Sequence, residues 1–281
     1  MNGLRLGMKN RRRWSLALIY TLLTIGAAVV IYPFFFMVMN SVKPGPEILH
    51  DPLSLPTHIT WNGYVEVFRS LDILNLFKNS LIISGSVTIL NVLLSAMVAF
   101  ALAKIDFPGR NLLFLMVLGT MMVPAILLLI PKYTMLFNWG WVNTYKALIL
   151  PVAVQPYNIF LIRQFYKQIP DDFLDAAKVD GCNLWGVFWR ILLPMSAPVL
   201  VTVAVLSFMG AWNDLLEALL YLRDDSLYTV QLGLYSFQSE IPGKNAEQLW
   251  AATTLVTLPV VLLFFWLQRY FIRAFSGVGL K

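Results

Sequence analysis

Long uninterrupted apolar runs dominate this sequence, and they restrict its fold more than any other feature does. A helix needs about 20 apolar residues to cross the roughly 30 Å of hydrocarbon in a bilayer. Apolar residues make up 58% of the 281 and charged residues 13%, whereas a soluble domain carries about 25% charged residues. The strands of a membrane barrel alternate apolar and polar residues, and these runs do not. The sequence therefore predicts an all-α integral membrane protein with six transmembrane helices, at about 14–39, 78–103, 112–131, 144–165, 197–222 and 250–272.

The distribution of lysine and arginine predicts how these helices are oriented. With the N-terminus inside, 14 of the 21 basic residues fall on the inner side and seven on the outer side. Cytoplasmic loops carry the excess of basic residues, so both termini are expected in the cytoplasm. The net charge of +6 then reflects orientation and not an affinity for nucleic acid. The expected parts are a cytoplasmic N-terminus, a transmembrane domain, a cytoplasmic loop within it and a cytoplasmic tail, at 1–13, 14–272, 166–196 and 273–281.

Motifs of catalysis and of nucleotide binding are missing from the sequence. The Gly243-Lys244 pair lacks the glycine five residues earlier that a phosphate-binding loop needs. No G-x-S-x-G and no H-E-x-x-H occurs. A single cysteine, Cys182, excludes a cysteine-pair metal site, and His50 and His58 are interpreted as ordinary loop residues. We therefore expect a chain that is not an enzyme and that holds neither a metal ion nor a cofactor of its own.

A polar segment, Asp171–Pro194, interrupts the apolar pattern between the fourth and fifth expected helices. Pro170 suits the first turn of a helix, and the carboxylates of Asp171 and Asp172 favour a helix N-terminus. Gly181 tolerates the left-handed backbone conformation that commonly ends a helix. The segment therefore predicts a short helix that begins near Asp171 and ends at Gly181.

On that short helix, Phe173, Ala176 and Ala177 are expected to form one apolar strip, because they are spaced i, i+3 and i+4. Small alanine side chains allow another surface to approach closely, and the surrounding aspartates can orient a basic partner. A second helix is expected to begin with Asn183 as its cap and to be closed by Pro194. An amphipathic loop on lipid headgroups is the alternative, but basic residues would suit anionic lipids better. Docking to a soluble protein is the preferred interpretation.

These residues also resemble a known motif. The stretch DAAKVDGC, followed by ILLP, is similar to the EAA motif of ABC importer transmembrane subunits, with Asp175 where that family most often has glutamate. Four further stretches resemble the carbohydrate branch of the family, of the maltose-transporter type: IPKYTMLFNWGWVNTYKALILP, FLIRQFYKQIP, LSFMGAWNDLLEALL and QRYFIRAFSGVGLK. The resemblance covers nearly the whole chain and keeps the family's order.

The resemblance implies a set of partners and a role for the polar segment. In the family, the first short helix is a coupling helix that sits in a cleft of the ATPase subunit. The residues that would make this contact are Asp171, Asp172, Phe173, Asp175, Ala176, Ala177, Asp180, Gly181 and Pro194. The implied partners are a second, different permease subunit, two ATPase subunits that bind the ATP and magnesium, and an extracytoplasmic solute-binding protein. The implied function is that of a permease subunit in a bacterial cell membrane, which imports a sugar or oligosaccharide by alternating access.

Two carboxylates inside the fifth expected helix, Asp214 and Glu217, indicate a polar route through the bilayer. Ionisable residues at the centre of a span cost roughly 2.5–3.5 kcal/mol each. The two lie three residues apart and share a face with Gly210, Asn213 and Tyr221, so this stripe should face water or a neighbouring helix. The expected substrate path consists of Trp212, Asn213, Asp214, Glu217, Gln155 and Asn158. Pairing with a partner subunit is the alternative for the stripe.

Other polar residues in the expected spans can be explained by helix packing as well as by a functional role. Ser84, Thr88, Asn91 and Ser95 recur at helical spacing, which is typical of helix packing. Gln155-Pro156 and Asn158 mark a kink, where packing and the lining of a cavity are both open.

The sequence indicates the type of transporter more clearly than it indicates the class of solute that is carried. The alternative is the same role in an importer of another solute, such as glycerol phosphate, but few basic residues lie inside the spans, which favours a neutral solute. A self-contained carrier or a membrane enzyme is a third class, and the lack of a clear internal repeat argues against it.

Overall fold

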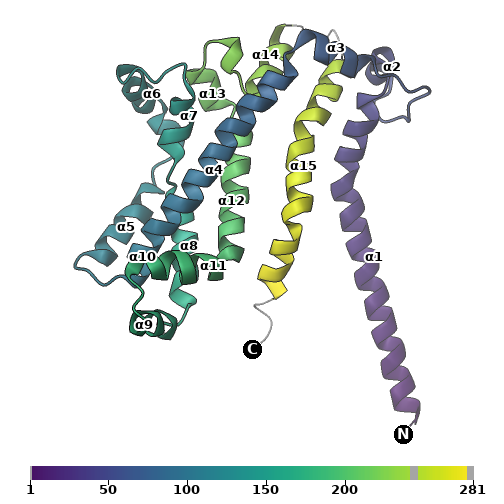
Figure 1. Cartoon of the computed structure of the whole chain (residues 1–281). Coiled ribbons are helices and arrows are strands. Elements are labelled where there is room, and N and C mark those ends of the chain that lie inside the picture. Colours follow the sequence, from purple (N-terminus) through teal and green to yellow (C-terminus); the bar gives the residue numbers. More distant parts are fainter. Residues whose placement is uncertain (1, 241–245, 277–281) are drawn as a thin grey trace. The chain divides into compact units, whose positions relative to one another are not determined.

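The structure, a computed structural model, describes residues 2–240 and 246–276, and every regular element within those ranges is a helix (Figure 1). The α-helices are α1 Asn2–Ser41, α2 Gly45–His50, α3 Asn62–Ser70, α4 Ile73–Lys104, α5 Arg110–Thr120, α6 Leu129–Asn138, α7 Tyr145–Ile149, α8 Pro156–Gln168, α9 Asp172–Val179, α10 Leu184–Val187, α11 Leu193–Met195, α12 Ala197–Trp212, α13 Leu216–Tyr221, α14 Val230–Glu240 and α15 Ala246–Ser276. Short 3-10 turns are η1 Ala125–Leu128, η2 Leu150–Val152 and η4 Asp225–Leu227, and η3 Phe188–Leu192 is a π-helical turn. The predicted all-α class is confirmed.

The chain divides into two compact units, and each is described by itself. Unit 1 comprises residues 1–70 and 241–255, and unit 2 comprises residues 71–240 and 256–281. Of the expected cytoplasmic tail, residues 277–281 lie outside the described part of the chain.

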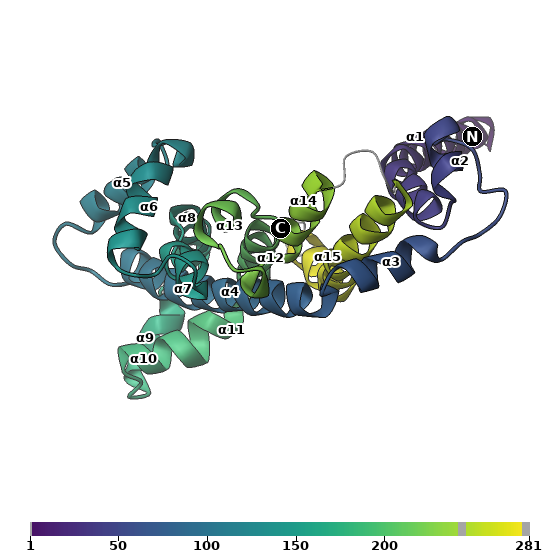
Figure 2. The same cartoon turned by 90° about the horizontal axis from the view of Figure 1, so that it is seen from above.

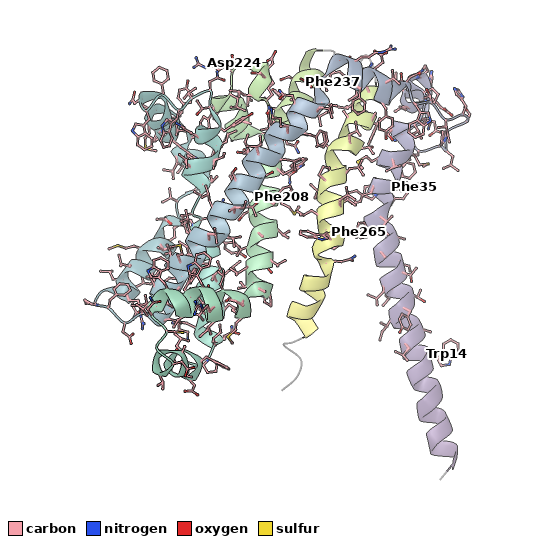
Figure 3. All side chains as sticks on the ribbon, in the orientation of Figure 1. Trp14, Phe35, Phe208, Asp224, Phe237 and Phe265 are labelled. Carbon is pink, nitrogen blue, oxygen red and sulfur yellow. The ribbon has the colours of Figure 1, made fainter. Side chains whose placement is uncertain are left out.

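Unit 1 holds α1, α2, α3 and the first part of α15. Side chains such as Trp14 and Phe35 project from α1 and are exposed, as suits a helix that faces lipid (Figure 3). Near the end of this unit, Gly45 N donates a hydrogen bond of 3.1 Å to Glu247 Oε2 at the start of α15. A Cβ atom on Gly63 in α3 would lie 2.6 Å from the Glu247 carbonyl oxygen, so only glycine permits this close approach. Helix α3 therefore packs closely on the start of α15.

Unit 2 is organised around α4, which packs chiefly against α12 and α8. Its first turn is capped by Asp72, whose Oδ1 accepts a hydrogen bond of 3.2 Å from Asn75 N. Ala96 and Ala99 on α4 are fully buried, and small residues of this kind let helices approach closely in a membrane. Asp224 and Phe237 lie at the end of unit 2 where α4 begins (Figure 3).

The polar face of α4 supports the packing interpretation. Ser84 and Thr88 donate hydrogen bonds to the backbone carbonyl oxygens of Ser80 and Ser84, one turn earlier in the same helix. Asn91 Nδ2 donates a hydrogen bond of 2.7 Å to the carbonyl oxygen of Val152, at the break between α7 and α8. The predicted kink is thus present, and α4 itself satisfies one of the carbonyl groups that the kink frees.

Four helical segments are long and apolar enough to span a membrane: Leu16–Ser41, Ile73–Lys104, Tyr145–Gln168 and Ala246–Trp266. Two further helix pairs reach that length only as bent spans, Arg110–Thr120 with Ala125–Asn138 and Leu184–Met195 with Ala197–Trp212. The number of six, and the orientation of the spans, stay predictions.

The third expected helix, 112–131, is not straight in the structure. Its two halves meet at an angle of 88°. Pro124 lies at the break, and proline both lacks a backbone N–H and disfavours helix in the residue before it, here Val123. Hydropathy alone could not detect the bend, because apolar residues continue through it.

The fifth expected helix, 197–222, is interrupted after Trp212. Asn213 Nδ2 donates a hydrogen bond of 2.9 Å to the carbonyl oxygen of Met209, and Asp214 Oδ1 accepts one of 3.1 Å from Glu217 N. Short polar side chains that bond the local backbone in this way compete with helical hydrogen bonds. The chain therefore restarts as α13 at Leu216, and the stripe expected on one continuous helix is divided between two.

Candidate functional site: a coupling segment and a polar pocket

The polar segment after α8 forms the two short helices that the sequence predicts. The first, α9, ends at Val179, and Gly181 just beyond it has a φ of +81°. Cys182 N donates a hydrogen bond of 2.9 Å back to the carbonyl oxygen of Ala177, which is the bonding pattern of a left-handed helix stop. Asn183 then caps α10, since its Oδ1 accepts a hydrogen bond of 2.8 Å from Gly186 N.

The second short helix passes through a π-helical turn before it ends. It continues from α10 through η3 into α11, and Pro194 lies one residue before its end. Proline crowds the carbonyl oxygen four residues earlier, and a wider turn relieves this contact. Pro194 thus closes the helix, as expected.

The apolar strip expected on α9 is divided between two faces, which corrects the sequence prediction. Ala177 and its neighbour Leu174 are each 5% exposed and pack into the core of unit 2. Phe173 and Ala176 lie on the exposed face, where Phe173 is 50% exposed. The i, i+3, i+4 rule places residues near one another but does not say which neighbour faces the bundle. Leu174 was not part of the expected strip, but it is buried, and the side of α9 that carries Leu174 and Ala177 faces the core.

Carboxylates surround the exposed face of α9. Asp172, Asp175 and Asp180 are exposed, and helical geometry places Asp172 and Asp180 on either side of Ala176. Asp171 precedes the helix, and its Oδ1 lies 2.5 Å from Lys104 Nζ at the end of α4. The short helices α9, α10 and α11 lie beside this end of α4 and project to one side of it (Figures 1 and 2). The structure thus presents an apolar surface around the small Ala176, with an acidic rim.

A pocket of about 220 Å³ lies toward the opposite end of unit 2. It brings together three residues of the expected substrate path, Gln155, Asp214 and Glu217. The other residues that line it are Ile83, Val87, Leu148, Val152, Gly210, Ala211 and Thr229. An apolar wall with a few convergent polar groups is the usual make-up of a small-molecule site.

One residue of this region was not predicted from the sequence. Lys132 on α6 lies 2.6 Å from Glu217 Oε1, with side-chain exposures of 19% and 21%. Its Nζ also lies 5.9 Å from the centre of the Tyr221 ring. Lys132 lies just beyond the third expected helix, 112–131, and the 88° bend that returns α6 toward α13 leaves no mark in hydropathy. A carboxylate such as Glu217 inside the membrane needs a cationic partner, and a search for that partner could have pointed to Lys132.

The remaining path residues lie away from the pocket. Trp212 is 1% exposed and stacks on Phe208, with ring centroids 5.5 Å apart. Asn213 is exposed and accepts a hydrogen bond of 3.2 Å from Gln231 Nε2. Asn158 is buried, and its Nδ2 donates hydrogen bonds to Asn91 Oδ1 (2.8 Å) and Ser207 Oγ (3.0 Å). These contacts give Asn158 a packing role among α4, α8 and α12, and they leave Trp212 in the core.

Comparisons with known proteins agree with this architecture. The family model described as "Binding-protein-dependent transport system inner membrane component" matches residues 91–277. The chain is 35% identical over 268 residues to the arabinooligosaccharides transport system permease protein AraQ of Halalkalibacterium halodurans, covering 92% of this chain and 96% of that protein. It is 34% identical over 272 residues to the trehalose/maltose transport system permease protein MalG of Thermococcus litoralis, with the same shares covered.

A solved structure supports the fold. The crystal structure of a bacterial ABC transporter involved in the import of the acidic polysaccharide alginate contains a chain that matches with a TM-score of 0.80 and 21% identity, covering 92% of this chain and 97% of that chain. The family resemblance stated from the sequence is confirmed. The protein belongs to the binding-protein-dependent transport system inner membrane components, and it is a non-catalytic, multi-pass permease subunit of an ABC importer in the cytoplasmic membrane, where a partner ATPase hydrolyses the ATP.

Proposed function

We propose that this permease imports a sugar or oligosaccharide, with α9 as the ATPase contact and the pocket on the substrate path. Relatives named for arabinooligosaccharides and for trehalose and maltose support the substrate class. The single observation that supports the coupling role is the exposed, acid-rimmed face around Ala176 on a helix whose Leu174 and Ala177 pack into the core. The proposed assembly pairs this chain with a different permease subunit, two ATPase subunits and an extracytoplasmic binding protein.

The docking face has a chemistry that a soluble partner can complement. Val179 is 88% exposed and Phe173 50%, and both lie beside the small Ala176. Exposed apolar groups with a charged rim are typical of a protein interface. The partner cleft should therefore carry an apolar floor and basic groups at its edge.

Assembly is tested by purification of the tagged chain in mild detergent, with the bound proteins identified by mass spectrometry. An ATPase with a nucleotide-binding loop and a second permease chain are expected. The binding protein encoded or recovered with them is then screened against arabinotriose, maltose, trehalose and glycerol phosphate by calorimetry. A stable preparation that contains only this chain would contradict the proposed assembly.

The docking face is tested by Ala176→Trp. Because Ala176 is exposed, the larger side chain should leave the fold intact and block the close approach of the ATPase. The expected result is loss of the co-purified ATPase with an unchanged thermal transition. Gln168→Trp, at an exposed position on α8, is the matched control and should retain the ATPase.

The pocket favours a neutral solute over a phosphorylated one. Two carboxylates and no basic side chain line it within the part of the chain described, and the nearby Lys132 is already paired with Glu217. Carboxylate and amide groups such as Asp214 and Gln155 can accept and donate hydrogen bonds to sugar hydroxyls. Asp214→Asn should therefore lower sugar uptake while the ATPase still co-purifies. Unchanged uptake would remove the pocket from the path and would favour a role in subunit contact.

A further inference from the structure

The junction between α4 and α9 contains a buried lysine whose contacts bear on how the coupling helix acts. Lys104 is the last residue of α4, and its side chain is 4% exposed. Its Nζ donates hydrogen bonds to the carbonyl oxygen of Ile169 (2.6 Å) and to Asp171 Oδ1 (2.5 Å). A buried ammonium group is stable only when its donors are paired, so this geometry is strongly determined.

The two acceptors stand on either side of the turn between α8 and α9. Ile169 follows the last residue of α8, so its carbonyl oxygen lies at the negative end of that helix, where a cation is favoured. Asp171 leads into α9, and its backbone carbonyl oxygen accepts hydrogen bonds from Leu174 N (2.8 Å) and Asp175 N (3.0 Å). One ammonium group therefore joins the end of α4, the end of α8 and the start of α9.

The end of α4 is in turn held to α8 and α5. Arg163 on α8 is 3% exposed, and its Nε donates a hydrogen bond of 3.0 Å to the carbonyl oxygen of Leu102. The guanidinium carbon of Arg163 lies 3.6 Å from the centre of the Phe114 ring on α5. The ends of α4 and α8 are thus held together and against α5, so a displacement of α9 would act on connected helices and not on a loose loop.

The core contacts of Leu174 and Ala177 on α9 are apolar and not directional. Such contacts permit sliding, whereas the ammonium group fixes distance and direction. We infer that Lys104 is a positioning residue that makes α4 move with α9 when the ATPase closes. This inference rests on the proposed coupling role of α9.

The test follows the response to ATP on the far side of the membrane, so it needs no known solute. In the full transporter in proteoliposomes, Cys182 is replaced (Cys182→Ser) and a single cysteine is placed in the pocket (Gln155→Cys). A membrane-impermeant maleimide outside the vesicle reports opening of the pocket, with ATP and vanadate inside. ATP hydrolysis and the amount of bound ATPase are measured on the same preparation.

ATP should raise the labelling rate in the parent and in Lys104→Arg, which keeps the cation. In Lys104→Met, which keeps the length without the charge, the ATP-dependent rise should fall about ten-fold while ATP hydrolysis and bound ATPase are retained. Lys167→Met removes an exposed lysine of α8 as the matched control and should behave like the parent.

Each other outcome has a defined meaning. A full ATP-dependent rise in Lys104→Met would overturn the inference and leave the proposed function intact. An absent rise in a parent that binds ATPase would overturn the proposed alternating-access role of the pocket, and this inference with it. If Lys104→Met does not assemble, Asp171→Ala replaces it, because that carboxylate is 76% exposed and its loss should not unfold the chain. A reduced rise with bound ATPase and hydrolysis retained supports the inference, and a full rise overturns it.

Discussion

The exposed face of α9 and the pocket of unit 2 treat charge in opposite ways. On α9, Asp172 and Asp180 lie on the exposed surface, and Leu174 and Ala177 pack inward. At the pocket, Glu217 lies largely buried and 2.6 Å from Lys132. The first arrangement directs charge toward something outside the chain, and the second neutralises charge within it.

This difference separates residues that serve a partner from residues that serve the fold. Exposed carboxylates are hydrated and cost the folded state little, so they are available to steer and orient another protein. A carboxylate removed from water must be paired, and its loss leaves a cation that has lost its partner. Substitutions in the two regions should therefore differ in what they damage.

The largest effect on stability is expected in the core against which α9 packs, and not on the exposed face of α9. Phe188 is 1% exposed, and its ring centroid lies 5.5 Å from that of Phe100. Phe188→Ala should lower the free energy of unfolding by about 3–5 kcal/mol, because it opens a cavity in the core. The thermal transition in mild detergent measures this. Phe173→Ala, on the exposed face, should leave that transition nearly unchanged and lose the ATPase, and a similar destabilisation by both variants would remove the distinction between the two faces.

The next effect is expected at the pocket. Glu217→Ala leaves Lys132 in a partly buried site without its carboxylate, which should cost about 1–3 kcal/mol of stability. Glu217→Gln keeps an acceptor oxygen and should cost less. The same thermal measurement compares them. If the two variants were equally stable, the acceptor oxygen that glutamine keeps would contribute nothing once the charge is gone; if both matched the parent, the ion pair itself would contribute nothing.

The sequence predicts the regular parts of this molecule well because their causes are local. The stop after α9 follows from Gly181 and the start of α10 from Asn183, and the structure has both. Each depends on residues within a few positions of one another, so a single chain read in order contains the needed information.

The candidate sites were predicted less completely because they depend on contacts between distant segments. The Lys132–Glu217 pair joins residues 85 positions apart, and the Lys104–Asp171 pair joins residues 67 positions apart. Neither partner is marked by local spacing. Trp212 was expected on the substrate path, and the structure packs it against Phe208, one turn away, and Phe77, which is distant from it in sequence.

A smaller effect is expected where α9 ends. Gly181 has a φ of +81°, and a side chain in that conformation costs about 1–2 kcal/mol. Gly181→Ala should therefore lower the thermal transition modestly. Gly210→Ala is the informative control, since Gly210 lies inside α12 and a Cβ added there would have no neighbouring atom within 4 Å, so alanine should raise stability by about 0.5–1 kcal/mol. Shifts of the same sign would argue against a left-handed stop at Gly181.

The smallest effect on stability is expected on the acidic rim, and there the comparison is most sharply tested. Asp172→Asn and Asp180→Asn should each change the free energy of unfolding by no more than about 0.5 kcal/mol, since both side chains are exposed. If the rim orients a basic partner, the same variants should weaken ATPase retention in low salt and lose that difference near 1 M salt, where the Debye length falls to about 3 Å. Asp106→Asn, at an exposed carboxylate on the α4–α5 turn, is the control. If ATPase retention changed neither with salt nor in the rim variants, α9 would dock through Phe173, Ala176 and Val179 alone. The carboxylates would then serve only to keep that face soluble in water.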